Sequence, residues 1–339
     1  MNLQPRMHGG TDALGAAPFD FSTNSNGCGP CPMALAAVQH ADASRYPDPH
    51  YTQLRQHLGH FHGVAPERLV LAASASEFIF RFTAWMKQGG AASVWLPAAA
   101  YGDYAHAAQA WGLQRCTHPF NAELIWACEP SSPLGQAHAP WPVWLMEGRP
   151  ATQQLVLDCA YAPLRLSGAS SLTATQREQV WQLYSPNKAL ALTGVRAAYA
   201  IAPVHAIQAV CQLDALAPSW PVGAHGVAML QAWTQDATRD WLRQSLVTLR
   251  DWKAAQLQML QDMGWQCLPS DTNFFCAVPP AGVELAHGLQ ALRAQGIKLR
   301  DAASLGLAGH VRISVQNPQA QQALARALAA LQPTLEVTQ

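Results

Sequence analysis

The sequence predicts an α/β fold with a mainly parallel sheet flanked by helices, followed by a smaller C-terminal α+β domain. Short apolar runs alternate with helix-like segments over the first two thirds of the chain, which is typical of a parallel sheet covered on both faces. The last third mixes short strands with helices instead. The 339 residues are enough for two domains and a large core.

The short apolar runs predict strands at residues 93–96, 124–128, 155–157, 180–184 and 198–202. Around them, apolar residues recur at helical spacing or small residues open a helix-like segment. These segments predict helices at residues 32–40, 50–62, 77–85, 104–111, 173–182, 203–216 and 226–233. The end of the helix over 173–182 overlaps the strand that begins at 180.

A long helix through Leu242, Leu246, Leu249 and Trp252 leads out of this core. Beyond it, strands are predicted at 272–278 and 310–315, and helices at 283–295 and 320–331. The N-terminal residues form an irregular, Gly-rich arm. We therefore expect an arm over residues 1–35, a large domain over 36–240 and a small domain over 241–339.

Composition excludes several classes of function. Half of the residues are hydrophobic and 12% are charged, a globular composition with an apolar lean that fits a covered subunit interface. The net charge is zero and no basic stripe occurs, which argues against a nucleic-acid partner. The start lacks the apolar run of a signal peptide, and no apolar stretch is long enough to span a membrane. We expect a cytoplasmic protein with no metal site.

Eight scattered cysteines do not form a disulfide framework in a chain of this size. Cys28 and Cys31 spell the C-x-x-C of thiol oxidoreductases, so a redox function is one alternative. That motif belongs at the start of a helix after a strand, whereas here it follows a polar, Gly-rich turn. A Gly-Pro turn with coincidental cysteines is the simpler explanation, and a disulfide between the two stays open.

Lys188 is one of only four lysines and lies among alanine and leucine. A poorly solvated amine is less readily charged and is a better nucleophile. Ser185, three residues before it, and Arg196, eight after it, are able to hold a phosphate. This pattern suggests a Schiff-base lysine for pyridoxal phosphate (PLP), although most lysines are ordinary surface groups.

The other requirements of PLP chemistry have candidates in order along the chain. Asp158 ends a predicted strand, where it would keep the pyridine nitrogen protonated, although an Asp there is more often a turn residue or cap. Tyr161 would donate to the ring hydroxyl, and Tyr101 would stack on the ring, with Tyr104 as a second candidate.

Ala75 and Ser76 begin the helix before Glu77, and their N–H groups would meet the phosphate. An ordinary N-cap by Ser74 would produce the same pattern.

Four segments carry a resemblance to a known family: Arg45-Tyr46-Pro47-Asp48-Pro49, Asp158-Cys159-Ala160-Tyr161, the stretch 185–199, and Val311-Arg312-Ile313-Ser314-Val315. They resemble motifs of fold-type I PLP enzymes of the class I/II aminotransferase superfamily, in the branch of histidinol-phosphate aminotransferase and threonine-phosphate decarboxylase. The resemblance implies a large domain with a mainly parallel seven-stranded sheet, a small C-terminal domain and a homodimer. It assigns Lys188 to the Schiff base, Ser185 and Arg196 to the cofactor phosphate, and Arg312 to the substrate carboxylate. Tyr46 would reach the cofactor phosphate of the neighbouring subunit.

The N-terminus resembles one subfamily more closely. His8-Gly9-Gly10 followed by the stretch 19–26 is similar to the H-G-G…D-F-S-x-N-x-N opening of threonine-phosphate decarboxylases of cobalamin biosynthesis. There the arm covers the site, which implies His8, Gly9 and Asn24 as substrate-binding residues. Arg300 stands where that subfamily has a second substrate arginine.

The chain also departs from the family pattern. The asparagine that touches the ring hydroxyl is replaced by Ser132, whose shorter hydroxyl still donates. Cys159 replaces a glutamate, the residues 72–74 replace G-N-G, and Ala198 replaces a glycine.

The function expected from this pattern is PLP-dependent decarboxylation of L-threonine O-3-phosphate to (R)-1-amino-2-propanol O-phosphate, for cobalamin biosynthesis. The first alternative is an aminotransferase acting on histidinol phosphate or another amino acid, since the same residues serve both reactions. A protein that keeps the fold but has lost activity is a third reading, motivated by Ser132.

Overall fold

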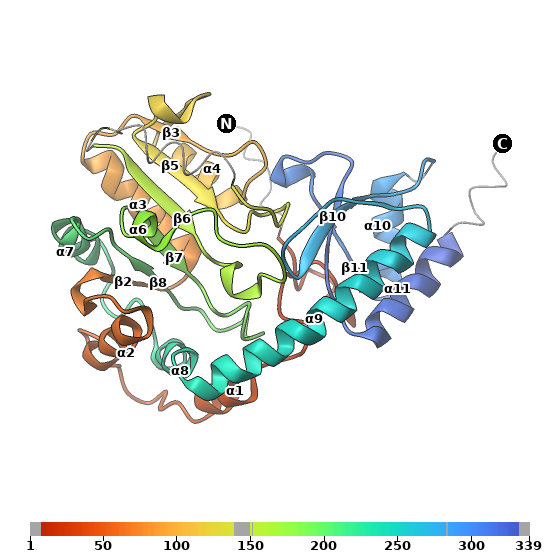
Figure 1. The fold of residues 1–339 in the computed structure, drawn as a ribbon, viewed down its shortest axis with the longest axis horizontal. Helices are drawn as coiled ribbons and strands as arrows, with labels where there is room; N and C mark the ends of the chain where they lie inside the picture. Colours follow the sequence, from red (N-terminus) through yellow and green to blue (C-terminus); the bar gives the residue numbers. More distant parts are fainter. Residues whose placement is uncertain (1–7, 139–149, 151, 283, 332–339) are drawn as a thin grey trace.

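The computed structural model describes residues 8–138, 150, 152–282 and 284–331. Three sheets with seven, four and two strands organise these residues. Helix α9 (Asp236–Asp262) runs from beneath the seven-stranded sheet to the body that holds the four-stranded sheet (Figure 1). The predicted division into an arm, a large domain and a small domain stays a prediction.

The seven-stranded sheet has the strand order β2-β8-β7-β6-β5-β3-β4. Its strands are β2 (Leu69–Ala72), β3 (Ser93–Trp95), β4 (Gln114–Arg115), β5 (Leu124–Cys128), β6 (Gln154–Asp158), β7 (Trp181–Tyr184) and β8 (Ala198–Ile201). Among the described strands of this sheet, β8 runs opposite to the other six. The expectation of a mainly parallel α/β sheet is therefore confirmed.

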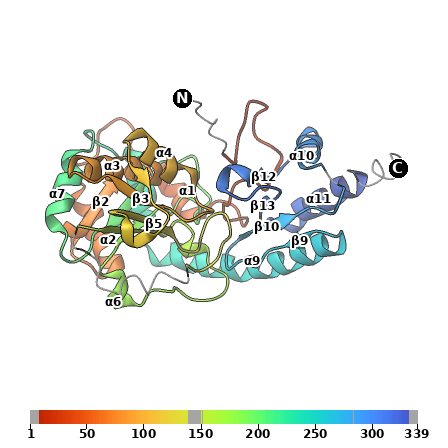
Figure 2. The same ribbon diagram turned by 90° about the horizontal axis from the view of Figure 1, so that it is seen from above.

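Helices cover both faces of this sheet (Figures 1 and 2). They are α1 (Pro32–Gln39), α2 (Thr52–His62), α3 (Ala75–Gln88), α4 (Gly102–Ala110), α6 (Ala174–Arg177), α7 (Ile207–Ala215) and α8 (Ala224–Trp233). Alternate residues of β6 enter different cores, since Val156 packs with Phe78 and Trp126 whereas Leu155 and Leu157 pack on the opposite face. Burial of both faces explains why these strands are continuous apolar runs.

The C-terminal part holds the four-stranded antiparallel sheet, with the order β12-β13-β10-β9. The helices and strands of this C-terminal part are β9 (Gln266–Cys267), β10 (Phe274–Val278), α10 (Leu285–Ala294), β11 (Ile297–Lys298), β12 (Arg300–Asp301), β13 (Val311–Ser314) and α11 (Pro318–Leu331). In the N-terminal arm, β1 (Phe19–Asp20) pairs in parallel with β11. Backbone pairing between β1 and β11 therefore attaches the arm to the C-terminal part, although the two segments are far apart in sequence.

Three expectations about local structure differ from the fold. The arm is not wholly irregular, because the distant backbone of β11 provides a partner for β1. The helix predicted over 173–182 is only the four-residue α6, because the buried residues of β7 pair with β6 instead. Strand β2 was not predicted from the sequence. It is fully buried and contacts both α3 and β8.

The predicted start of helix α10 at Val283 lies outside the described residues. None of the helices in the described ranges is long and apolar enough to cross a bilayer.

Candidate active site

A cavity of about 610 Å³ opens at one edge of the seven-stranded sheet. The parallel strands all end at this edge, where open α/β sheets bind ligands. Their following loops or last residues supply Ser76, Tyr101, Ser132, Asp158 and Ser185, from β2, β3, β5, β6 and β7 respectively. Arg196 precedes the antiparallel β8 and therefore reaches the same edge.

The cavity brings together the predicted site residues from distant parts of the chain. Those that line it are His8, Gly9, Asn24, Ala75, Ser76, Tyr101, Ser132, Asp158, Tyr161, Ser185, Lys188, Arg196, Arg300 and Arg312. Tyr46 does not line it: its side chain is 77% exposed and stacks on Trp220, with ring centroids 4.3 Å apart. Its role in a neighbouring subunit stays a prediction.

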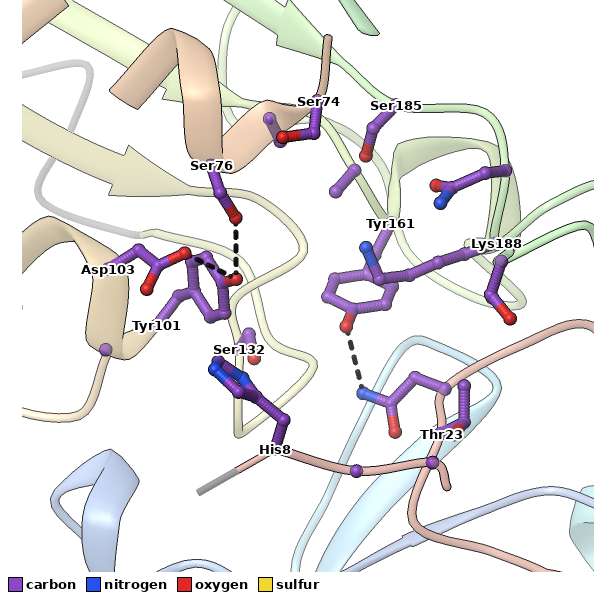
Figure 3. A pocket seen from close by; sticks show the side chains of 18 of the residues that line it. His8, Thr23, Ser74, Ser76, Tyr101, Asp103, Ser132, Tyr161, Ser185 and Lys188 are labelled. Carbon is purple, nitrogen blue, oxygen red and sulfur yellow. Dashed lines mark hydrogen bonds between the residues drawn. The ribbon is translucent and has the colours of Figure 1, made fainter. Parts of the chain in front are cut away.

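The amine of Lys188 points into the cavity beside Tyr161 (Figure 3). Its Nζ lies 5.2 Å from the centroid of the Tyr161 ring. The backbone is held from the arm, because the Asn26 N–H donates to the Lys188 carbonyl at 2.9 Å. A half-buried amine on a fixed backbone is well placed for covalent attachment to an aldehyde.

Asp158 is buried and its carboxylate is held in place from two sides. It accepts a 2.7 Å hydrogen bond from the Tyr104 hydroxyl and a 2.9 Å bond from the Ala160 N–H. Burial raises the pKa of Asp158, and the Tyr104 bond, the Ala160 bond and the charge of Lys188 only partly oppose this shift. A cation such as a protonated pyridine nitrogen would relieve the cost of keeping this carboxylate charged.

Tyr104 is therefore not the second ring-stacking candidate that the sequence suggested. Its ring stacks on Trp126, with centroids 4.9 Å apart, and its hydroxyl is used by Asp158. Tyr101 lines the cavity, and its stacking on the cofactor ring stays a prediction. Its hydroxyl donates to Asp103 at 2.8 Å and lies 3.0 Å from the Ser76 hydroxyl (Figure 3).

Asp103 and His106 are cavity residues that the sequence reasoning missed. Asp103 is 4% exposed, and its Oδ1 lies 3.6 Å from Nδ1 of His106. The only signal was their position, since both follow Tyr101 within one helical turn or two. The pair places a second buried carboxylate in the cavity.

The end of the cavity at the N-terminus of α3 is suited to an anion. Ser74 caps helix α3 by accepting from the Glu77 N–H at 3.1 Å, so the α3 N-terminus, with Ala75 and Ser76, opens into the cavity. The hydroxyl of Ser185 is buried, and within the described residues it has no hydrogen-bond partner. Together with Arg196, these groups fit the phosphate of PLP.

The opposite wall contains two arginines from the four-stranded sheet. Arg300 on β12 and Arg312 on β13 are directly paired in the antiparallel register. Burial and the charge of Arg312 lower the pKa of Arg300. Two like charges side by side and out of solvent are unfavourable unless an anion lies between them, so this wall is suited to an anionic substrate group.

The arm closes the cavity over this wall. The Arg312 guanidinium donates to the Ser22 carbonyl at 3.0 Å and to the Ser132 hydroxyl at 3.4 Å. The Asn24 amide donates to the Tyr161 hydroxyl at 3.2 Å. Asn24 thus contacts the residue expected at the cofactor ring, rather than the arginine wall.

The cysteine motif shows no sign of activation. Cys28 and Cys31 are both free thiols. Burial raises the pKa of Cys28 to about 11, whereas reactive thiols have a lowered pKa.

The family model of aminotransferase class I and II matches residues 17–331. The chain belongs to this family. A histidinol-phosphate aminotransferase of Jannaschia sp. (strain CCS1) is 26% identical over 93% of this chain and 92% of its own length. Membership confirms the predicted superfamily and, because the superfamily uses PLP, the predicted cofactor.

Solved structures share the fold. The histidinol-phosphate aminotransferase from Sinorhizobium meliloti, solved with pyridoxal-5'-phosphate, has a TM-score of 0.77 at 22% identity over 91% of this chain and 90% of that one. L-threonine-O-3-phosphate decarboxylase from Porphyromonas gingivalis has a TM-score of 0.74 at 20% identity over 92% and 99%. Both of these enzymes therefore share this fold.

Proposed function

We propose that this protein is a PLP-dependent aminotransferase acting on a phosphorylated amine of the histidinol-phosphate type. Full-length similarity to curated histidinol-phosphate aminotransferases favours this reaction over the decarboxylation expected from the N-terminal motif. The observation that supports an anionic substrate is the Arg300–Arg312 pair, since both arginines line the same cavity as Lys188.

In this proposal one group of residues holds the cofactor and another binds the substrate; the cofactor group comes from the edge of the seven-stranded sheet. Ser76, Ser185 and Arg196 would hold the cofactor phosphate, Tyr101 would cover the ring, and Asp158 would hold the protonated ring nitrogen. Bound PLP supplies an aldehyde for covalent attachment and a ring that accepts electrons from the substrate. Tyr161 and Ser132 would donate to the ring hydroxyl.

Lys188 has two tasks at one atom. Its Nζ would hold the cofactor aldehyde in the resting enzyme, and the same nitrogen, when free, would move a proton at the substrate Cα. The Tyr161 ring beside Nζ restricts the amine to this side of the cavity. Arg300 and Arg312 bind the anionic group and so orient the bond that breaks.

Threonine-phosphate decarboxylation is the second candidate. The arm residues His8, Gly9 and Gly10, which the resemblance to that subfamily implies at the substrate, line the cavity. Threonine phosphate carries both a phosphate and a carboxylate, which suits two adjacent arginines, whereas histidinol phosphate carries only the phosphate.

One single-turnover experiment separates the candidates. The PLP-loaded protein is mixed with histidinol phosphate or with threonine phosphate, without and with a 2-oxo acid. Transamination converts the cofactor to its amine form and needs the 2-oxo acid to recycle it, whereas decarboxylation releases CO₂ and leaves the aldehyde form. Release of CO₂ from threonine phosphate, with no reaction of histidinol phosphate, would overturn the aminotransferase proposal. Binding of PLP without either reaction would favour the inactive reading.

We further propose a homodimer in which Tyr46 reaches the neighbouring site. The support is the exposed Tyr46–Trp220 stack, together with the solvent exposure of the cavity-lining residues Thr193, Gly194 and Arg196.

A further inference from the structure

A second set of charged residues fixes the arm from outside the cavity. Asp12 accepts two hydrogen bonds from Arg293, Nε to Oδ2 at 3.0 Å and Nη2 to Oδ1 at 2.8 Å. The Lys298 ammonium lies 2.9 Å from Oδ2 of Asp12 and donates to the Gly10 carbonyl at 2.5 Å. Arg293 also donates to the Gly15 carbonyl at 2.9 Å. None of these three side chains lines the cavity.

One carboxylate is thus shared between two cations that are largely covered. The side chains of Arg293 and Lys298 are only 16% and 14% exposed. The bonds from Arg293 and Lys298 hold the pKa of Asp12 well below its ordinary value, so the carboxylate stays charged at neutral pH. A bidentate arginine bond adds geometric precision that a single surface ion pair lacks.

Within the arm, the contacts continue to the substrate wall. A Cβ built on Gly9 would lie 2.1 Å from the Ser22 carbonyl oxygen, so the two backbone segments are in direct contact. The Gly10 N–H donates to the Ser22 hydroxyl at 2.8 Å, and the Ser22 carbonyl accepts from Arg312. A displacement of Gly9 and Gly10 would therefore disturb the backbone that orients Arg312.

The anchors of the arm and the two arginines belong to one stretch of chain. Arg293 is on α10, Lys298 on β11 and Arg300 on β12, and β13 beside it carries Arg312. The cofactor residues instead lie at the edge of the seven-stranded sheet. The arm and the arginine wall therefore form a separate unit that faces the cofactor residues across the cavity.

We propose that Asp12, Arg293 and Lys298 form a latch that positions residues 8–11 over Arg300 and Arg312, and so determines the affinity for the anionic group of the substrate. This inference rests on the proposed function in one respect, the use of an anionic substrate. The three latch residues are positioning residues, since they act through Gly9, Gly10 and Ser22. Cofactor binding is independent of them.

The test compares the wild type with Asp12→Asn, which keeps the side-chain size and removes the charge. We expect the KM for the phosphorylated substrate to rise about tenfold, with kcat changed less than about twofold. Hydrogen exchange of the Gly10 and Gly15 amides should be faster by about tenfold in the substrate-free protein. The Kd for PLP, measured by absorbance titration, should not change.

Asp236→Asn is the matched control, because it removes the same charge from an exposed ion pair with Arg239 on α9. It should alter neither KM nor exchange. In a cycle with Arg293→Ala, the double variant should be no worse than the more impaired single variant, as expected for two partners in one contact.

Two results would overturn the latch. One is wild-type exchange at Gly10 and Gly15 in Asp12→Asn; the other is faster exchange with an unchanged KM. The exchange measurement needs no substrate, so failure of the latch is distinguishable from failure of the proposed reaction. Arg293→Lys, which retains the charge but loses the bidentate bond, should show an intermediate KM.

Discussion

Arg300 and Arg312 lie opposite each other on the neighbouring strands β12 and β13, and both face the cavity that contains Lys188. Arg300 donates to the Ser304 hydroxyl at 2.7 Å, whereas Arg312 donates to the Ser22 carbonyl. Side by side, the two guanidinium groups give the cavity a positive wall that an anionic substrate would stabilise.

Replacing one of these arginines should weaken substrate binding more than it affects the cofactor. We expect Arg300→Gln and Arg312→Gln each to lower kcat/KM by about 10–100-fold, the loss of one charge-assisted hydrogen bond. The PLP absorbance should be unchanged. Steady-state kinetics with the accepted substrate measure the first effect, and an unaffected kcat/KM in both variants would refute the anion wall.

Lys188→Ala should abolish the visible absorbance that marks covalently attached PLP, along with activity, because no other lysine is among the residues that line the described cavity. Lys253→Ala is the control, because Lys253 is also partly buried but lies on α9 and donates to the Ser270 carbonyl, away from the cavity. An absorption spectrum after incubation with PLP and desalting gives the answer. Retention of that absorbance by Lys188→Ala would show that another group holds the cofactor.

Asp158→Asn should lower kcat by about 10²–10³-fold, because a neutral amide cannot stabilise the positive charge expected at the ring nitrogen. PLP should still bind, with weakened affinity measured by absorbance titration. A kcat within a fewfold of the wild type would show that this carboxylate does not face the ring nitrogen.

The cofactor-free protein offers an independent test of the same carboxylate. Burial raises the pKa of Asp158 in the folded state above its unfolded value, so the folded state binds more protons between the two pKa values. The stabilising effect is present below about pH 4 and is lost as the pH rises through the folded pKa. Relative to Asp158→Asn, the Tm of cofactor-free wild type should therefore fall as the pH is raised. Parallel Tm curves for the two proteins would contradict this assignment.

Gly9→Ala should displace the arm without unfolding the protein. The added Cβ would meet the Ser22 carbonyl at 2.1 Å, and backbone cannot yield as a flexible side chain can. We expect a rise in KM of about tenfold or more and an unchanged Kd for PLP. Gly223→Ala, which has open space around the new Cβ, is the control and should behave as the wild type.

The predicted dimer can be tested through Tyr46. Sedimentation should give twice the mass of the chain, and Tyr46→Phe should weaken PLP affinity about tenfold through loss of one hydrogen bond to the phosphate. Trp220→Ala removes the ring on which Tyr46 stacks and should weaken PLP affinity as well. An active monomer would refute the proposed reach of Tyr46 into a neighbouring site.

Local sequence patterns were sufficient for much of the fold. Strand β5 has the predicted bounds, because a short buried run between polar turns leaves few alternatives. Asp158 was placed at a strand end, and parallel strands necessarily bring their ends to one edge. The prediction of a helix over 173–182 was wrong at its apolar end, because those residues form strand β7 and pair with β6. Such pairing depends on tertiary contacts rather than on the local pattern.

The sequence by itself therefore determined the α/β class, the family and the residues at the ends of the parallel strands, since hydrophobic periodicity and short motifs are local. Only the tertiary structure decided that the Tyr104 hydroxyl donates to Asp158, 54 residues away, rather than lying at the cofactor ring. It also placed Asp12 against Arg293, 281 residues away. Contacts of that kind follow from how sheets and arm pack together, and no pattern in neighbouring residues encodes them.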